Sequence, residues 1–398
     1  MKLLINFVFS NHKPVATEDL LKAFEEIIVG AGEIQGLDFS RAFKTWELQK
    51  GYPMITVSFN SAANQFEITQ DHYLSITEEK LEDDDSSWYI PLSYTTGVLP
   101  DFEDNLFKDY FMDGTTQKTI STAGISGFDE SQWFIFNIQQ LGYYRVNYDE
   151  SNWRKIIAVL NSENYELIHV LNRAQLVDDA LTFAFDGVIS YEIAFGVISY
   201  LERETNYIPW YPVTIHFDKL DYILKGTPLH NYFKRYVRKI IRRLYVTNGL
   251  QNIASDPVLN KFSRELSIDW TCRMGDQNCL NYAHSQLTKE IPKPVELTLL
   301  CNGLKGLMRQ TEFVNIYRKF QTSSDQNDRL RYIDALLCTS DPQTLSDLLE
   351  TTIGSGSESF YRSHERSRVY SNLVARSSVG LEVLFNFILR YYDEIRSV

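Results

Sequence analysis

The segment that most constrains the fold spans residues 142–149, Gly-Tyr-Tyr-Arg-Val-Asn-Tyr-Asp, and we refer to it as the joint. Residues 133–137 ahead of it and the joint itself are rich in aromatic and β-branched side chains, which suit a half-buried strand. Residues 149–152 then supply good N-cap types ahead of apolar residues at helical spacing: Trp153, Ile156, Ile157 and Leu160. The joint therefore predicts a change from strands to helices.

The length and hydropathy of the chain indicate several domains and no membrane span. The chain has 398 residues, more than one ordinary core accommodates, and 44% of them are hydrophobic, enough to fill two or three domains. No apolar run reaches the roughly eighteen residues that a membrane-spanning helix needs. Residues 1–9 are mostly apolar with one positive charge, but Asn6 interrupts them and no small-residue cleavage site follows. We therefore do not expect a signal peptide there.

The charge of the chain disfavours nucleic acid as a partner. With 39 basic and 52 acidic residues, the formal net charge is −13, and a polyanion would be repelled. One basic stretch is the exception: Lys234, Arg235, Arg238, Lys239, Arg242 and Arg243. Apolar residues recur through this stretch at helical spacing, so we interpret it as an amphipathic helix whose charged side is solvated or ion-paired. An anion-binding patch is the alternative.

A small antiparallel β-sandwich is predicted for roughly residues 50–147, because the apolar period changes to two from Gly51 onward. The predicted strands are residues 55–59, 66–70, 88–94, 133–137 and 143–148. The first two alternate around a polar turn and predict a hairpin, and Pro91 implies an edge or a bulge in the third. The acidic run at residues 78–85 lacks the spacing of a calcium loop, so we interpret it as an exposed loop.

Helical patterns lie on both sides of the sandwich. Residues 1–46 predict helices: an apolar stripe runs from Leu20 to Ile28, and another helix is expected to begin near Asp38. Residues 151–398 contain many helical segments of about ten to twenty residues, separated by short loops, which is typical of stacked antiparallel helix pairs. No fixed repeat is present, so the prediction is an irregular superhelix with a concave surface.

The four cysteines, Cys272, Cys279, Cys301 and Cys338, all lie in the predicted helical part. Free cysteines pack as small hydrophobic residues, so buried thiols are one interpretation. Two sequential disulfides are the other, and the spacing leaves both open. A zinc site is disfavoured, because the spacing lacks close cysteine pairs and no histidine stands at a matching interval.

Catalytic motifs are absent from the sequence. There is no H-E-x-x-H, G-x-S-x-G, P-loop or G-x-G-x-x-G motif, and no two histidines stand three or four residues apart. His364 and Glu365 begin like a zinc motif, but Arg368 stands where the second histidine is needed. From the residues alone we therefore expect no catalytic, cofactor-binding or metal-binding residue in this chain.

Several segments together carry a family resemblance. They are Thr17-Glu18-Asp19-Leu20, residues 45–53 (T-W-E-L-Q-K-G-Y-P), residues 88–92 (W-Y-I-P-L), the joint, residues 173–180 (R-A-Q-L-V-D-D-A) and residues 207–210 (Y-I-P-W). In this order they resemble the C-terminal half of the zinc aminopeptidases of the aminopeptidase N family, most of all its insect gut members. The resemblance covers the chain nearly end to end.

The resemblance implies a domain organisation and a cellular compartment. Residues 1–48 resemble the end of the catalytic domain, residues 49–147 the β-sandwich domain, and residues 148–398 a truncated helical superhelix. The cysteine spacing resembles two family disulfides, Cys272–Cys279 and Cys301–Cys338, which implies an oxidising compartment, extracellular or at the cell surface. Residues 1–9 would then belong to a late helix of the catalytic domain.

The departures from the family concern its catalytic features. The family's H-E-x-x-H motif, its glutamate ligand, its G-x-M-E-N segment and its transition-state tyrosine all precede the part that this chain resembles. Zinc would therefore belong to the complete enzyme, and no ligand for it is carried over. The sequence also stops at Val398, short of the family's last helices and without the hydrophobic tail of a lipid anchor. We expect a fragment, a truncated product or an incomplete gene model.

The expected function is that of the non-catalytic C-terminal portion of a zinc aminopeptidase. The family releases N-terminal amino acids from peptides, and its helical domain walls the peptide cavity, so a peptide is the expected partner if the native protein carries the catalytic half. The alternative is a stand-alone binding, scaffold or decoy protein that associates with a full-length aminopeptidase paralogue. In both cases the N-terminal helices lack the domain on which they normally pack, which predicts an exposed apolar face.

Overall fold

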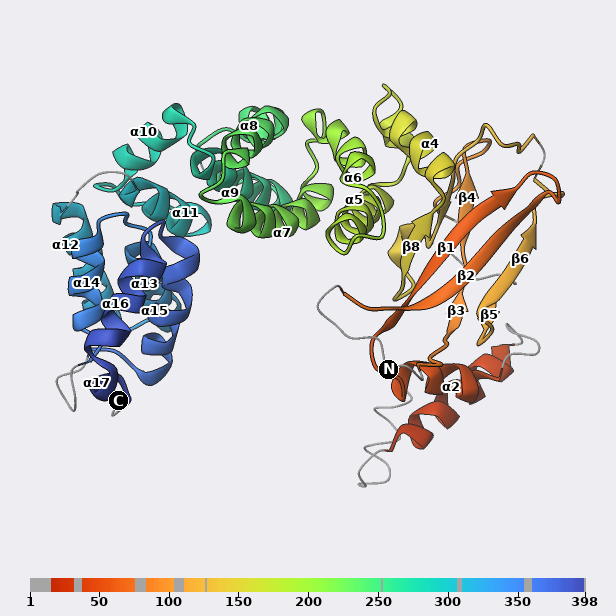
Figure 1. Cartoon of the computed structure of the whole chain (residues 1–398), viewed down its shortest axis with the longest axis horizontal. Coiled ribbons are helices and arrows are strands. Elements are labelled where there is room, and N and C mark those ends of the chain that lie inside the picture. Colours follow the sequence, from red (N-terminus) through yellow and green to blue (C-terminus); the bar gives the residue numbers. More distant parts are fainter. Residues whose placement is uncertain are drawn as a thin grey trace. The chain divides into compact units, whose positions relative to one another are not determined.

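The computed structural model describes residues 16–31, 38–75, 84–103, 111–125, 127–251, 253–305, 310–353 and 360–396. Residues 1–9 and most of the acidic run at residues 78–85 lie outside the described residues. The chain divides into two compact units, residues 1–200 and 201–398, and each is described by itself (Figure 1). Short β-sheets precede a long series of helices, which confirms the predicted mixed α and β class. The three-domain division stays a prediction.

Two helices open the described part of the first unit, α2 (Thr17–Ala31) and α3 (Phe39–Glu47). Helix α3 begins as predicted, because the Asp38 carboxylate caps it by accepting a hydrogen bond from the Arg41 amide at 2.9 Å. The Trp46 indole donates to the Tyr89 carbonyl at 2.9 Å, and the Thr45 hydroxyl accepts from the Tyr89 amide at 3.1 Å. These two bonds attach α3 to the β-rich part.

The main sheet is built on the predicted hairpin. Strands β1 (Tyr52–Asn60) and β2 (Gln65–Tyr73) pair antiparallel, and β6 (Gln117–Ser121) and β8 (Arg145–Tyr148) complete the order β6-β2-β1-β8. Alternate residues of β1, such as Ile55 and Val57, are fully buried, as period-two alternation requires. Strand β8 runs parallel to β1, which corrects the prediction of a wholly antiparallel sandwich. The long crossover between β1 and β8 permits this direction, whereas a short hairpin would not.

Two small sheets complete the β-rich part. Strand β3 (Tyr89–Pro91) pairs with β5 (Phe111–Asp113), and β4 (Tyr94–Thr96) pairs with β7 (Phe134–Phe136). The single strand predicted at residues 88–94 is therefore two strands. Strands β5 and β6 were not predicted, and β6 buries just Ile120 along its length, so its sequence carries almost no alternation. The core is aromatic: the Phe66 ring lies 4.8–5.9 Å from those of Phe59, Tyr94, Phe128, Phe134 and Phe136.

The joint is the predicted switch from strand to helix. The 3₁₀ turn η1 (Ile138–Gln140) precedes β8, and α4 (Glu150–Leu160) follows it, capped by Asp149, whose carboxylate accepts from the Asn152 amide at 2.8 Å. Helix α4 buries Trp153, Ile156 and Leu160. The first unit then continues through η2 (Tyr165–Leu167), α5 (Val170–Phe185) and α6 (Tyr191–Ile198).

All the regular secondary structure among the described residues of the second unit is helical. After η3 (Ser199–Glu202), its helices are α7 (Tyr207–Leu224), α8 (Leu229–Asn248), α9 (Val258–Arg273), α10 (Gln277–Gln286), α11 (Lys293–Leu304), α12 (Gln310–Thr322), α13 (Gln326–Leu336), α14 (Pro342–Glu350), α15 (Ser363–Arg376), α16 (Gly380–Arg390) and α17 (Tyr392–Arg396). Successive helices pack in pairs, α8 on α9, α10 on α11, α12 on α13 and α15 on α16 (Figure 1). This arrangement is the predicted stacking of helix pairs.

Two disulfides tie neighbouring helices of the second unit together. Cys272 of α9 is bonded to Cys279 of α10, and Cys301 of α11 is bonded to Cys338, which follows α13. All four cysteines are buried. The pairing is the one that the family resemblance implies, and each bond joins helices that also share a core.

A buried ion pair links α13 to α15. The Arg329 guanidinium donates two hydrogen bonds to the Glu365 carboxylate, both at 2.8 Å, and their side chains are 7% and 0% exposed. The Arg362 amide also donates to Glu365 at 2.9 Å, and Arg329 donates to the Phe320 carbonyl at 2.9 Å. Because both charges are fully hydrogen-bonded, neither is left without a partner on burial.

We expect Glu365→Ala to lower the free energy of unfolding by about 3–5 kcal/mol, because it leaves Arg329 charged and buried. The matched control is Glu150→Ala, which breaks the exposed pair between Glu150 and Arg154 at 2.6 Å and should change stability by about 0.5 kcal/mol or less. Urea unfolding of both variants measures the difference. Equal effects would contradict a structural role for the buried pair.

The second unit also contains a carboxyl group with a raised pKa. Burial raises the pKa of Glu265 from 4.5 to about 7, the neighbouring charge of Asp269 adds to the rise, and Arg331 opposes it. The folded state therefore holds this proton more tightly than the unfolded state does. The stabilisation is fully present below pH 4.5 and is lost as the pH rises through about 7.

Glu265→Gln removes this titration and should flatten the pH dependence of stability between about pH 4.5 and pH 8. The measurement is the urea midpoint of the variant and of the original protein across that range. A pH slope that is the same in both would show that Glu265 titrates at its ordinary pKa.

Candidate functional site

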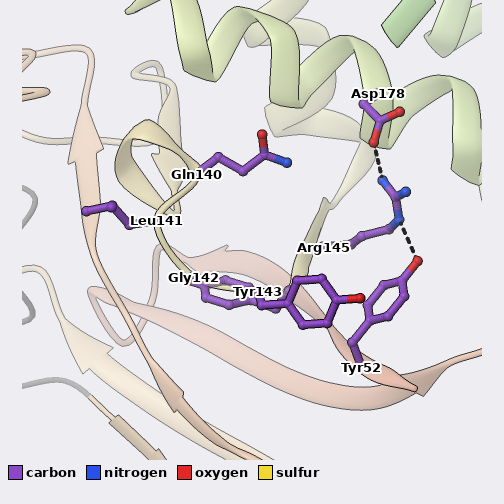
Figure 2. Close-up of a pocket in the computed structure, with 8 residues that line it drawn as sticks. Tyr52, Gln140, Leu141, Gly142, Tyr143, Arg145 and Asp178 are labelled. Carbon is purple, nitrogen blue, oxygen red and sulfur yellow. Dashed lines mark hydrogen bonds and ion pairs between the residues drawn. The ribbon is translucent and has the colours of Figure 1, made fainter. Parts of the chain in front are cut away.

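The joint borders a pocket of about 380 Å³ in the first unit, which we call the joint pocket (Figure 2). Strand β1 contributes Tyr52 and helix α5 contributes Asp178. The chain from the end of η1 to the start of β8 supplies the remaining lining residues: Gln140, Leu141, Gly142, Tyr143, Tyr144 and Arg145. The first four residues of the joint thus form one wall of this pocket.

The loop that forms this wall is held in an unusual backbone conformation. Asn137, Gln139 and Gln140 have positive φ angles of 63°, 52° and 55°. The left-handed region disfavours residues with a Cβ atom by roughly 1–2 kcal/mol each, and asparagine tolerates it better than glutamine. Such strain persists where the surroundings over-determine the conformation, and it clusters at functional sites.

Hydrogen bonds of Asn137, within the loop, hold part of this conformation in place. Its side chain is buried and donates to the carbonyls of Gly142 at 2.9 Å and Tyr144 at 3.2 Å. Its amide oxygen accepts from the Gly142 backbone at 2.8 Å, and its own backbone amide donates to the Ser93 carbonyl at 2.8 Å. One asparagine therefore closes the loop on itself and attaches it to the β-rich part.

Helix α5 supplies further hydrogen bonds that hold the same loop. Asn172 is fully buried, donates to the Asn137 carbonyl at 3.0 Å and accepts from the Gln139 amide at 2.8 Å. The Gln139 side chain donates to the Phe102 carbonyl at 2.8 Å. These bonds explain why α5 buries polar residues: they satisfy the backbone of the strained loop, which has no sheet partner at these positions.

Arg145 connects three elements beside the pocket. Its guanidinium donates to the carboxylates of Asp178 at 2.8 Å and Asp179 at 2.7 Å on α5, and to the Tyr52 hydroxyl at 3.2 Å on β1 (Figure 2). It also lies over the Tyr73 ring, 5.6 Å from the ring centre. Planar guanidinium groups suit such several-way recognition, whereas an ammonium group does not.

Asp179 is the more deeply buried of the two carboxylates. Its side chain is 2% exposed, and it accepts from the Val146 amide at 3.1 Å as well as from Arg145. Burial raises the pKa of Asp179 above the ordinary aspartate value, while the charge of Arg145 opposes the rise. Asp178, which is 27% exposed, lines the pocket instead. Asp179 therefore positions Arg145 and does not face a ligand.

The rim of the pocket carries exposed apolar groups. Tyr143 is 71% exposed and Leu141 is 55% exposed. The Tyr143 ring lies 5.3 Å from that of Tyr52 and 6.5 Å from that of Trp46 at the end of α3. Leu48, just beyond α3, is 74% exposed. The rim is therefore an apolar and aromatic edge held rigidly by a polar network.

The chemistry of the joint pocket suits binding. Among the described residues, its walls carry a guanidinium, a carboxylate, an amide and tyrosine hydroxyls. The arrangement can hold a polar or aromatic group against a fixed surface.

Residues with the chemistry of metal ligands do not converge in the described part of the chain: no group of three or more His, Cys, Asp or Glu side chains there could hold a metal ion. The start of a zinc motif is used structurally. Glu365 pairs with Arg329, and Arg368 donates to Asp334 at 2.7 and 3.0 Å. The described residues thus do not fit a zinc ion. The four cysteines are bonded in disulfides.

Several residues that fix the loop beside the joint pocket were not singled out by the sequence. Asn137, Gln139 and Asn172 have no motif, and no periodicity distinguishes them. Asn137 lies in a predicted strand, and its left-handed conformation follows from contacts with residues far along the chain. Arg145 and Asp178 do lie in quoted family segments, so these segments carried a partial signal for the site.

Comparison with known proteins defines the class of the chain. Residues 133–398 match the ERAP1-like C-terminal domain family. The matched part begins just before the strained loop and includes the joint, α5 and the whole second unit. The chain therefore belongs to this family, the C-terminal domain of aminopeptidases of the aminopeptidase N type.

Individual relatives agree with this assignment. The chain is 27% identical to an aminopeptidase N of Plutella xylostella over 97% of its own length and 41% of the relative's. It is 28% identical to a membrane alanyl aminopeptidase of Heliothis virescens, covering 95% of this chain and 37% of the relative. A human thyrotropin-releasing hormone-degrading ectoenzyme is 28% identical over 85% of this chain and 33% of its own length. The chain thus spans about two fifths or less of these relatives.

Within the described residues, no helix is both long enough and apolar enough to cross a bilayer.

We expect Arg145→Ala to lower the free energy of unfolding by about 3 kcal/mol or more, because it leaves Asp179 buried without its cation. The control is Arg154→Ala, whose pair with Glu150 is exposed and screened by solvent, so its loss should change stability little. Thermal and urea unfolding compare the two. If both variants unfold alike, Arg145 is not what holds the joint together.

Proposed function

We propose that this chain is the non-catalytic C-terminal portion of a zinc aminopeptidase, and that its helices wall the cavity in which a peptide meets the catalytic portion. The match of residues 133–398 to a family of aminopeptidase C-terminal domains carries the proposal. The named activities of the relatives belong to longer proteins, of which this chain covers two fifths or less. The family's reaction, release of N-terminal amino acids from peptides, would require residues supplied outside this chain.

The joint pocket supports a role in contact with another protein surface. Its rim exposes Leu141 and Tyr143, while the loop beneath is fixed by Asn137 and Asn172. A rigid aromatic edge presents contact area with little conformational entropy to lose on binding. In the proposal, this edge meets the catalytic portion.

The second candidate is a stand-alone binding, scaffold or decoy protein that associates with a full-length aminopeptidase. The same exposed edge favours it, since an isolated chain would leave Leu48, Leu141 and Tyr143 free to meet a partner. For both candidates we propose an extracellular or cell-surface location, supported by the two disulfides and by relatives named as membrane proteins or ectoenzymes.

The direct test is the zinc content of the purified chain, measured by elemental analysis, with hydrolysis of an alanine-linked chromogenic amide. We expect neither stoichiometric zinc nor turnover. A full-length relative purified in parallel provides the positive control. Zinc at about one equivalent together with turnover by the chain alone would contradict the proposal.

Docking through the joint rim is tested with Leu141→Ser and Tyr143→Ser. Each should weaken capture of the catalytic portion of a related aminopeptidase by about fivefold or more, because apolar contact area is lost from the centre of the interface. Leu99→Ser is the control, because Leu99 is 80% exposed and does not line the pocket. Equal weakening by all three, or by none, would exclude the rim as the contact.

A further inference from the structure

The solvent face of α8 is strongly basic, although the chain as a whole is acidic. The helix contains six lysine and arginine residues and no aspartate or glutamate, although the net charge of the chain is −13. Its opposite face is the buried apolar set predicted from the sequence: Phe233, Val237, Ile240, Ile241 and Leu244. The exposed face carries four cations, with an apolar or aromatic residue toward each end: Tyr232, Arg235, Lys239, Arg242, Arg243 and Val246.

Most of this positive charge is not neutralised within the unit. Lys239 pairs with Glu202 at 3.0 Å, and Arg235 lies over the Tyr232 ring, 4.9 Å from its centre. In the parts of the chain that the structure covers, no carboxylate lies within 4.0 Å of Arg235, Arg242 or Arg243. The charged side of α8 is therefore mainly solvated, and three guanidinium groups remain available to an anion.

Apolar side chains are exposed around the turn from α7 to α8. Tyr222 and Ile223, at the end of α7, are 67% and 55% exposed, and Leu229 and Tyr232, at the start of α8, are 60% and 61% exposed. Gly226, with φ of 82°, makes the turn between them. Four large apolar groups therefore protrude within eleven residues of chain, next to the first cations of α8.

The acidic groups beside this turn are already engaged. The Asp221 carboxylate accepts from His230 at 2.7 Å and from Arg273 at 2.9 Å, and Asp218 pairs with the same arginine. Their negative charge is directed into the unit's own ion pairs. An approaching anion thus meets the exposed cations without facing a free carboxylate at the turn.

We propose that the solvent face of α8 and the α7–α8 turn dock on an anionic phospholipid surface. Each lysine or arginine near such a surface adds to the attraction, and tyrosine, leucine and isoleucine side chains at a protruding turn suit insertion into the headgroup region. The apolar turn favours a phospholipid surface over an acidic polymer, because the headgroup region accepts apolar side chains and a charged polymer does not. The proposal concerns surface docking and does not rest on peptidase activity.

The test is co-sedimentation of the whole chain with phosphatidylcholine vesicles, with and without phosphatidylserine. We expect binding to the vesicles with phosphatidylserine, and release in about 1 M salt, where screening shortens the reach of charges to about 3 Å. Absence of binding to phosphatidylserine vesicles, or equal binding to both vesicle types, would overturn the proposal.

Two variants separate the charged from the apolar contribution. Arg242→Glu with Arg243→Glu should weaken binding at least about tenfold, and Leu229→Ser with Tyr232→Ser should weaken it about fivefold or more. The control is Lys289→Glu with Arg318→Glu, which makes the same change in net charge at exposed positions outside α8, in the bend after α10 and on α12. Circular dichroism checks that each variant remains folded.

The control variant should bind vesicles nearly as well as the original chain. Equal weakening by the control would mean that net charge alone matters, and the assigned face would be wrong. Soluble polyglutamate provides the competing partner. If it binds as tightly as the vesicles and the Leu229 and Tyr232 substitutions have no effect, the face recognises an acidic polymer and the membrane proposal fails.

Discussion

The first unit depends on the interaction between Arg145 and two consecutive aspartates of α5. Arg145 is on β8, its partners Asp178 and Asp179 are on α5, and the same guanidinium bonds to Tyr52 on β1. A strand added parallel to β1 after a long crossover has no tight turn to fix its place. The ion pair fixes it instead, and the Val146 amide bonded to Asp179 extends that anchor into the sheet.

The strained turn at residues 137–140, which leads into β8, follows from this anchor. With β8 fixed to α5 and the Asn137 amide bonded to Ser93, few residues remain to turn the chain, and three of them adopt left-handed angles. Asn172 satisfies the backbone groups that the turn exposes. The result is a rigid wall whose outer side chains, Leu141 and Tyr143, are free to meet another surface, while its polar groups are used internally.

The sequence predicted the parts of the fold that periodicity controls. The β1–β2 hairpin, the cap of α4 at Asp149 and the buried face of α8 all follow from spacing that burial imposes locally. The direction of β8, the split at residues 92–93 and the weakly patterned β6 depend on partners distant in sequence, so local patterns could not reveal them. The same holds for the candidate site. Family segments contain Arg145 and Asp178, although the sequence indicated no role for either, and the roles of Asn137 and Asn172 exist only in their mutual contacts.

The evidence for function also divides into what local sequence reveals and what only the folded chain reveals. Family membership follows from segments in order, whereas the joint rim and the basic face of α8 are surfaces that the folded chain assembles. In the proposed function, the chain contributes to a peptidase by shape and contact. The ion pairs of Arg145 hold the joint in a fixed geometry, and the disulfides and the buried ion pair of the second unit join neighbouring helices there. Rigidity is what a wall or a docking edge requires.

The most direct measurement is amide hydrogen exchange of the chain alone and mixed with the catalytic portion of a related aminopeptidase. If the chain acts by docking through the joint rim, exchange at residues 141–143 slows on mixing, while exchange at α8 stays unchanged. Unchanged exchange at the joint in a mixture that has formed a complex would contradict the account, because the contact would then lie elsewhere.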